Sequence, residues 1–379
     1  MLKKIDKKIW RLIGIIVGII ILLVLIALLI NLMGKERLDY TGIENKMVTV
    51  SKKYYKDNEM FLPKIDGNST EVSLDTLVKD GYMKDPSVYM NNNSLSCIGR
   101  VTVTKSGDTY GYYPYLNCGG KYETTYLSNK LKKNIVTSSD GLYKLNQYIV
   151  LKNGEKKNSE VFVYRGEAVN NHILINDVKW RIVKIDDNGN IVVIYDGKDP
   201  NQDLYSVWDD RYNTDKDGNY GKNDYLVSRA KENLEKIYKG NFLSSDLKSK
   251  LLSHSACIGK RGDSDTTNNG SIECSKVLKD VYLSLLPVYD YINASLDSNC
   301  KKVTDLECSN YNYLNTYSSS WWFITASKAK SHLVYKVSSD GITSSSASNS
   351  GRLRMVGVID AKTIVSGGDG TDENPYIVK

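Results

Sequence analysis

Residues 213–224 carry oxygen-bearing side chains at a spacing that suits calcium. An EF-hand loop places side-chain oxygens at positions 1, 3, 5 and 12, with a glycine at position 6 for the sharp turn. The matching residues, with the glycine and the residue after it, are Asn213, Asp215, Asp217, Gly218, Asn219 and Asp224. Asn replaces the usual first Asp, and Asp replaces the usual final Glu. Two interpretations follow: a calcium site, with calcium as the cofactor, or a solvated polar loop.

Aromatic side chains in the second half of the chain could stack on a ligand. The candidates for a sugar-binding or peptide-binding groove are Trp208, Tyr311, Tyr313 and Trp321. Aromatic rings offer a large apolar face with a polar edge, which suits such ligands. The alternative is that the tryptophans fill the core, as large apolar side chains usually do.

Residues that could perform catalysis are few. The three histidines are His172, His254 and His332. His254, within Ser253-His254-Ser255, is the best placed for a Ser-His pair, but a lone polar histidine beside a cysteine is more often structural. No glycine-rich loop has the form that cradles phosphates. The sequence therefore predicts a protein that is not an enzyme.

Six cysteines predict disulfide bonds. None lies in a C-x-x-C pair, and with so few histidines a structural zinc site is not expected. An even number of cysteines in an exported chain is typical of a disulfide framework. The first pair is symmetric about Gly107–Asp108, where a hairpin turn would bring the two together. Sequential pairing is favoured among the alternatives, joining Cys97 to Cys118, Cys257 to Cys274 and Cys300 to Cys308.

The N-terminal segment predicts a membrane anchor. Residues 12–33 contain no charge and consist mostly of Ile, Leu and Val, which is long enough to cross a bilayer. Basic residues precede this stretch at Lys3, Lys4, Lys7, Lys8 and Arg11. The positive-inside rule then keeps the N-terminus in the cytoplasm. We therefore expect a single-pass protein of the cell membrane, with residues 1–37 as cytoplasmic tail and signal anchor and the rest extracellular.

The charge distribution excludes one class of partner. The formal net charge is +7, and residues 1–37 alone hold seven basic and two acidic side chains. The exported part is therefore close to neutral. A nucleic-acid-binding protein needs a clustered basic face, so no nucleic-acid partner is expected.

The sequence predicts that the exported part consists of two α+β domains. In residues 38–155, Ile43, Met47, Val50 and Tyr54 recur at helical spacing, Ser73 could cap a short helix ending at Gly81, and the cysteine hairpin follows. This order, a membrane helix continued by an amphipathic helix and then a disulfide-closed sheet, resembles a pilin or pseudopilin. The prepilin processing motif is absent. A polar stretch at 137–160 suggests the boundary to the second domain.

Residues 156–379 predict a loop-rich α+β domain. Short runs rich in Ile, Val, Leu and aromatic residues predict strands at 173–175, 180–185, 191–195, 333–337, 353–359 and 376–378. Helical spacing predicts helices at 226–238 and 245–252. Several motifs occur in this order: Trp-Arg-Ile-Val at 180–183, Trp-Asp-Asp-Arg-Tyr-Asn at 208–213, Leu-Leu-Pro-Val-Tyr-Asp-Tyr-Ile-Asn-Ala-Ser at 285–295, Trp321-Trp322, and the glycine-rich ending at 366–376.

Together these motifs resemble a C-terminal module of surface proteins from low-GC Gram-positive bacteria. That module is distantly similar to the C-type-lectin-like fold of sulfatase-modifying factors. Those enzymes use a cysteine pair near the C-terminus, and this chain has no cysteine after Cys308, so their activity is not expected here. The module also usually shows Arg-Pro-Val where this chain has Arg354-Met355-Val356.

These features predict a membrane-anchored bacterial surface protein whose extracellular module binds a glycan or a protein, in adhesion or envelope interaction. The alternative is a pseudopilin-like accessory component of a cell-envelope or secretion apparatus.

Overall fold

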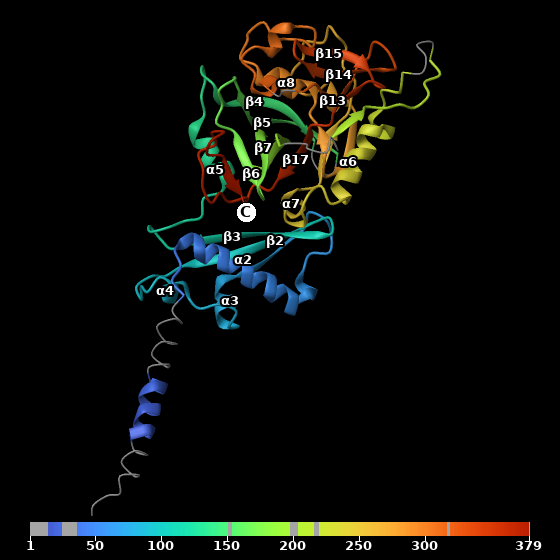
Figure 1. The fold of residues 1–379 in the computed structure, drawn as a ribbon. Helices are drawn as coiled ribbons and strands as arrows, with labels where there is room; N and C mark the ends of the chain where they lie inside the picture. The colour runs from blue at the N-terminus through green and yellow to red at the C-terminus, as the bar shows by residue number, and fades with distance from the viewer. Residues whose placement is uncertain are drawn as a thin grey trace, which may run out of the picture. The chain divides into compact units, whose positions relative to one another are not determined.

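The computed structural model describes residues 14–24, 36–150, 154–197, 204–215, 220–316 and 319–378. The fold is mixed α+β, as predicted, and divides into two compact units (Figure 1). The smaller unit comprises Met1–Asp57, Val72–Val101 and Pro114–Glu123. The larger unit comprises Asn58–Glu71, Thr102–Tyr113 and Thr124–Lys379.

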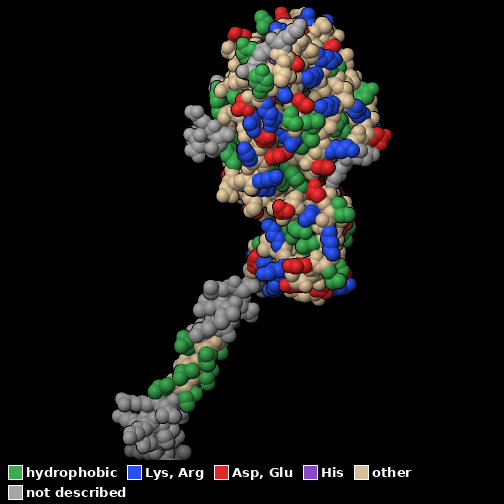
Figure 2. Space-filling view, turned by 90° about the vertical axis from the view of Figure 1, so that its right-hand side faces the viewer, with side chains coloured by type: hydrophobic (Ala, Val, Ile, Leu, Met, Phe, Trp, Pro, Cys, Tyr) green, Lys and Arg blue, Asp and Glu red, His purple; other side chains and the backbone are tan. Residues whose placement is uncertain are grey.

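Residues 14–24 form a helix that packs against nothing in the described structure. Its side chains are exposed, and hydrophobic ones cover much of its surface (Figure 2). Within the described ranges, no helix is both long and apolar enough to cross a membrane. The predicted anchor at 12–33 falls only partly within those ranges, and its basic flank at 3–11 lies outside them. The membrane span therefore stays a prediction.

The long helix of the smaller unit follows its apolar spacing. Helix α2 (Tyr40–Asp57) buries Ile43, Met47 and Val50, as predicted, and its next buried aromatic is Tyr55 rather than Tyr54. Helix α3 (Leu74–Lys79) begins at the predicted cap, where the Ser73 hydroxyl accepts a hydrogen bond from the Thr76 amide at 3.0 Å. Between residues 36 and 124, which the structure describes in full, the other helical elements are a four-residue helix, α4 (Pro86–Tyr89), and a 3₁₀ turn, η1 (Glu59–Phe61).

A three-stranded sheet follows the predicted hairpin. Its order is β1 (Ser69–Ser73), β2 (Ile98–Ser106) and β3 (Thr109–Asn117). The two-residue turn uses Gly107 at φ +57°, a backbone conformation that glycine adopts without strain. All three sequential disulfides are present: Cys97–Cys118, Cys257–Cys274 and Cys300–Cys308. The predicted pairing is confirmed.

An eight-stranded sheet organises the larger unit. Its main path runs β12-β17-β8-β7-β5-β4, with β6 paired to β7, and β18 paired to β6 in parallel. Strands β6, β7, β8, β17 and β18 correspond to predicted strands. The bounds are β4 (Gly141–Val150), β5 (Lys156–Arg165), β6 (His172–Ile175), β7 (Val178–Ile185), β8 (Ile191–Tyr195), β12 (Ser284–Leu285), β17 (Met355–Ile359) and β18 (Tyr376–Val378).

The hairpin β4–β5 spans the predicted domain boundary at 155. Its strands pair from Gly141 opposite Arg165 to Val150 opposite Lys156, so residues on both sides of 155 belong to one sheet. Residues 124–155 accordingly belong to the larger unit. The first residues of β5 are exposed and carry polar side chains. For this reason the sequence pattern did not predict a strand there.

A second sheet has five strands in the order β15-β14-β13-β16-β9, and β10 pairs with β11. These strands are β9 (Tyr205–Val207), β10 (His254–Cys257), β11 (Val277–Val281), β13 (Trp321–Ala326), β14 (Leu333–Ser338), β15 (Gly341–Ser346) and β16 (Ser350–Arg352). The helices are α5 (Leu127–Leu131), α6 (Arg229–Lys239), α7 (Ser245–Lys250) and α8 (Val288–Ala294), with 3₁₀ turns η2 (Lys132–Asn134), η3 (Tyr225–Val227), η4 (Glu273–Ser275), η5 (Leu306–Ser309) and η6 (Tyr313–Thr316).

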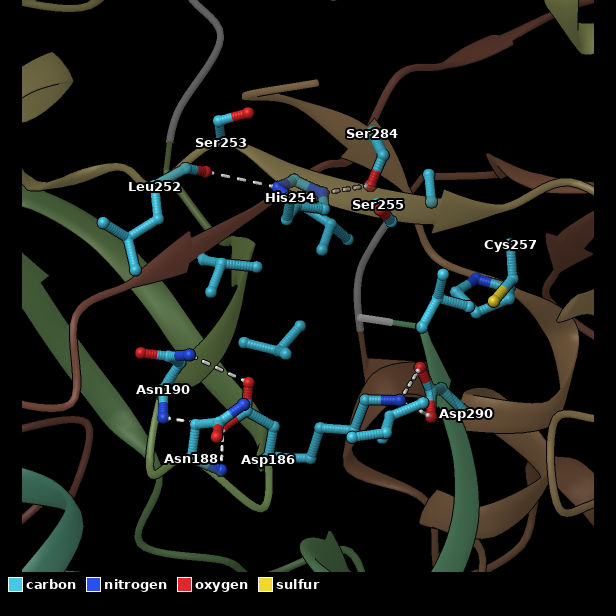
Figure 3. Close-up of a pocket in the computed structure, with 18 of the residues that line it drawn as sticks. Asp186, Asn188, Asn190, Leu252, Ser253, His254, Ser255, Cys257, Ser284 and Asp290 are labelled. Carbon is cyan, nitrogen blue, oxygen red and sulfur yellow. Dashed lines mark hydrogen bonds and ion pairs between the residues drawn. The ribbon is translucent and has the colours of Figure 1, made fainter. Parts of the chain in front are cut away.

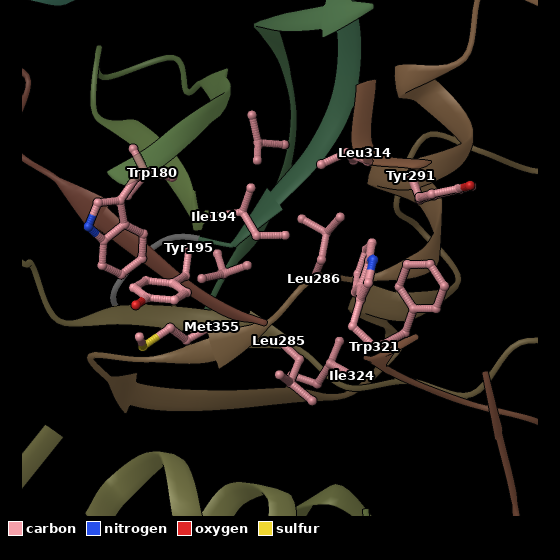
Figure 4. Packing of buried hydrophobic residues seen from close by; sticks show 14 of the residues in the cluster. Trp180, Ile194, Tyr195, Leu285, Leu286, Tyr291, Leu314, Trp321, Ile324 and Met355 are labelled. Carbon is pink, nitrogen blue, oxygen red and sulfur yellow. The ribbon is translucent and has the colours of Figure 1, made fainter. Parts of the chain in front are cut away.

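Tryptophans fill the core of the larger unit. Trp180 and Trp321 lie among aliphatic side chains of both large sheets (Figure 4). Trp208 is also fully buried, and its indole Nε1 donates a hydrogen bond to the Phe323 carbonyl at 2.9 Å. The predicted ligand groove is therefore not formed by Trp208, Tyr313 and Trp321, because all three are core residues.

Replacing Trp208 should destabilise the protein rather than only weaken ligand binding. We expect Trp208→Ala to lower the free energy of unfolding by about 3–5 kcal/mol, since it leaves a large cavity. Tyr311, which is 60% exposed, is the matched control, and Tyr311→Ala should change stability by less than about 0.5 kcal/mol. Chemical denaturation measures both; equal losses would contradict this account of the core.

Candidate functional site

A cavity of about 400 Å³ lies in the larger unit (Figure 3). Its lining comes from the turn between β7 and β8, from β10, and from residues of β12, β17 and α8. These segments are distant in sequence, and the two sheets and helix α8 bring them together. Apolar side chains make up part of the wall: Ile149, Val192, Leu285, Ile324, Val356 and Val358.

An ion pair joins Lys184 of β7 to Asp290 of α8 in this lining. The Lys184 Nζ lies 2.7 and 2.8 Å from the two carboxylate oxygens, and it also donates to Gln147 Oε1 and Tyr289 Oη at 3.1 Å. The two charged side chains are 10% and 2% exposed.

The protonation of this pair follows from its contacts. Burial alone would lower the pKa of Lys184, but the Asp290 carboxylate outweighs it, and the net pKa is raised. Burial raises the pKa of Asp290, while Lys184 opposes that shift. Because Lys184 keeps its proton, we treat the pair as ionised. Its ammonium donors are already engaged, so it offers no free cation to a ligand.

A tight turn from Asp186 to Asn190 forms another part of the lining. The Asp186 Oδ1 accepts hydrogen bonds from the backbone amides of Asn188 at 2.9 Å and Asn190 at 2.8 Å. Gly189 completes the turn at φ +85°. Burial raises the pKa of the Asp186 carboxyl. The turn thus places amide and carboxyl groups at the cavity, and Asp360 adds a second carboxyl.

Hydroxyl groups line the cavity around β10. Ser253 immediately precedes this strand, His254 and Ser255 begin it, and Ser284 comes from β12. The His254 Nε2 lies 3.3 Å from the Ser284 Oγ, and its Nδ1 lies 3.4 Å from the Leu252 carbonyl oxygen. Burial lowers the pKa of His254 to about 4, so the imidazole is neutral at neutral pH.

The structure does not bring the predicted ligand-binding residues together at this cavity. Trp208, Tyr313 and Trp321 are buried in the core, and only Tyr311 is exposed. Sequence reasoning selected aromatic residues by type, which does not separate core from surface. It noted His254 but could not pair it with Ser284, and it did not select Asp186–Asn190, which lies between two predicted strands.

The described part of the predicted calcium loop is engaged in other contacts. The Asn213 amide donates to the Gly221 carbonyl at 2.8 Å, and its oxygen accepts from the Asp215 backbone amide at 3.1 Å. The Asp224 carboxylate caps η3 and lies 3.4 Å from Lys276 Nζ. Asp217 and Asn219 lie outside the described ranges.

Across the ranges that the structure covers, no group of three or more Asp, Glu, His or Cys side chains could hold a metal ion. The calcium site stays a prediction.

Comparisons with known proteins give no match. No protein-family model matches this chain, no curated protein is similar to it, and no solved structure matches its fold.

The Lys184–Asp290 pair gives a stability prediction. We expect Asp290→Ala to lower the free energy of unfolding by about 3–5 kcal/mol, because it leaves a buried ammonium without its counter-ion. The double variant Lys184→Met/Asp290→Leu removes both charges and should recover most of that loss. Urea denaturation of the two variants tests this. A double variant as unstable as the single one would show that the pair does not act through its charges.

Proposed function

We propose that this chain is a membrane-anchored bacterial surface protein whose larger unit binds a ligand in the cavity. Two features support a surface location. An uncharged stretch at 12–33 follows a basic N-terminus, and its described part is an exposed apolar helix. Three disulfides suit an oxidising, extracellular environment.

The charge of the cavity favours a neutral, hydroxylated ligand such as a glycan. Of the described residues that line it, Lys184 alone is a lysine or arginine, and Asp290 neutralises it. Asp186 and Asp360 leave the lining acidic, which opposes a phosphate or carboxylate ligand. Serine hydroxyls, amides and the rings of Tyr148 and Tyr289 provide hydrogen bonds and apolar contact for a sugar. The absence of a free cation from this lining is the observation that carries the proposal.

The proposal also assigns a fold type to each of the two units. Helix α2 against a disulfide-closed sheet supports a pilin-like stalk, and the larger unit would be the C-type-lectin-like module that presents the cavity. The alternative function, an accessory of a secretion or envelope apparatus, draws on the same stalk. Calcium at residues 213–224 would be a separate ligand of the larger unit.

The anchor predicts a defined topology. Protease added to intact cells should digest the residues that follow the anchor, because the basic N-terminus stays in the cytoplasm. The measurement is immunoblotting for a C-terminal tag, with a cytoplasmic protein as the control for lysis. A C-terminus protected on intact cells, and digested only after lysis, would contradict this topology.

A binding experiment tests the cavity. The full-length chain in lipid nanodiscs should bind selected neutral glycans on an array. Asn188→Ala and Ser255→Ala each remove one polar group from the lining and should weaken binding about 3–10-fold, as expected for one hydrogen bond. Asn45→Ala, on the exposed face of α2, is the matched control. Glycan binding unchanged by both cavity variants would contradict the site, and co-purification with secretion components without glycan binding would favour the alternative.

A further inference from the structure

We propose that Ser284 and His254 form a nucleophile–base pair that hydrolyses an ester group in this cavity. This inference rests on the proposed function in one respect: the ligand proposed there would be the molecule that carries the ester. The hydrolytic chemistry depends on the contacts of two side chains that line one cavity.

The hydrogen bonds around His254 determine which ring nitrogen carries the proton. The Leu252 carbonyl oxygen, 3.4 Å from Nδ1, can only accept, so Nδ1 must donate. In a neutral imidazole the other nitrogen, Nε2, is then an acceptor. The Ser284 hydroxyl, 3.3 Å from Nε2, must therefore donate to it. This is the arrangement in which a histidine takes the proton of an attacking serine.

The surroundings of the pair set the strength of the base. Burial lowers the pKa of His254, and the Leu252 carbonyl partly opposes that shift. The charged groups that line the same cavity are Asp186, Asp360 and the mutually neutralised Lys184 and Asp290. None of the described carboxylates forms a hydrogen bond or ion pair with the His254 ring. A backbone carbonyl thus orients the ring where a Ser-His-Asp triad uses a carboxylate, and turnover should be slow.

The reaction uses only an ester and water. The Ser284 Oγ attacks the ester carbonyl carbon while Nε2 takes the hydroxyl proton. The carbon–oxygen bond of the ester then breaks, and the alcohol leaves with the proton returned from Nε2. Water attacks the acyl-serine, giving up a proton to Nε2, and release of the carboxylic acid restores Ser284. The net change is ester plus water to alcohol plus acid.

A free hydroxyl lies in the same lining. The Ser253 Oγ is buried and has no hydrogen-bond partner within the described structure. Ser253 is among the residues that line the cavity, but its hydroxyl points away from the side of Asp186 and Asp290 (Figure 3). Because this hydroxyl forms no hydrogen bond with the His254 ring, the nucleophile assigned here is Ser284, which does form one.

The test uses a fluorophosphonate probe on the full-length chain, with tandem mass spectrometry to locate the adduct. We expect the adduct on Ser284 of the unaltered protein, which needs no variant to fold. Ser284→Ala should abolish labelling, and His254→Gln should slow it about 100-fold, the usual contribution of a general base. Ser339→Ala, which removes an exposed hydroxyl in the β14–β15 turn, should label at the normal rate. Circular dichroism checks that each variant is folded.

The pH dependence of labelling separates two roles for His254, because a purely structural histidine would not change the labelling rate with pH. The labelling rate should stay level from pH 8 to about 5.5 and fall near pH 4, where His254 becomes protonated. No adduct, an adduct on another residue, or His254→Gln labelling at the normal rate would each overturn the proposal. The probe carries no sugar, so the two proposals can fail separately. Glycan binding without labelling would overturn the esterase activity and leave the proposed glycan ligand intact. Labelling without glycan binding would support the esterase activity and overturn the glycan as the ligand.

Discussion

The buried pairing of Lys184 with Asp290 is the interaction on which the cavity depends. Lys184 belongs to the central strand β7, and Asp290 belongs to α8, so the pair fixes this short helix against the large sheet. An unpaired charge at either position would be costly to bury. The first residue of α8 is held separately, since the Val288 amide donates to Thr325 Oγ1 of β13 at 3.0 Å. Helix α8 therefore connects the two sheets beside the cavity, which its residues help to line.

The same pair determines the chemistry of the cavity. Because the ammonium donors of Lys184 are engaged by Gln147, Tyr289 and Asp290, a ligand meets hydroxyls, amides and carboxyls instead of a cation. Neutral polar groups suit a neutral hydroxylated ligand, and a buried neutral histidine beside a serine suits acyl transfer. The ligand proposal follows from this arrangement of charge, and the hydrolytic proposal follows from the separate contacts of His254 with Ser284 and Leu252.

Local features of the fold could be predicted from the sequence. Runs of apolar and β-branched residues located β7 and β8, Ser73 capped α3 as expected, and the symmetry of two cysteines about Gly107 located a hairpin. Each of these signals is local, and the longest joins two cysteines 21 residues apart. Over such short stretches, spacing alone is informative. The helix expected at 226–238 begins later, at Arg229, because Ser228 caps it after a 3₁₀ turn.

Long-range features could not be predicted in this way. The cavity combines Asp186, His254 and Ser284, whose proximity depends on strand order and not on spacing. Residue type also failed to separate core from surface, since Trp208 and Trp321 are buried while Tyr311 is exposed. The polar first residues of β5 resembled a linker because they belong to an exposed part of a hairpin.

The most direct test of the cavity is amide hydrogen exchange of the full-length chain, with and without a glycan that binds it. Ligand contact should slow exchange in two segments that are distant in sequence and both line the cavity, residues 186–190 and 253–256. The account predicts protection in both segments together, with Asn45 and its neighbours on α2 unchanged. Protection confined to the region of Tyr311, or to the smaller unit, would contradict it.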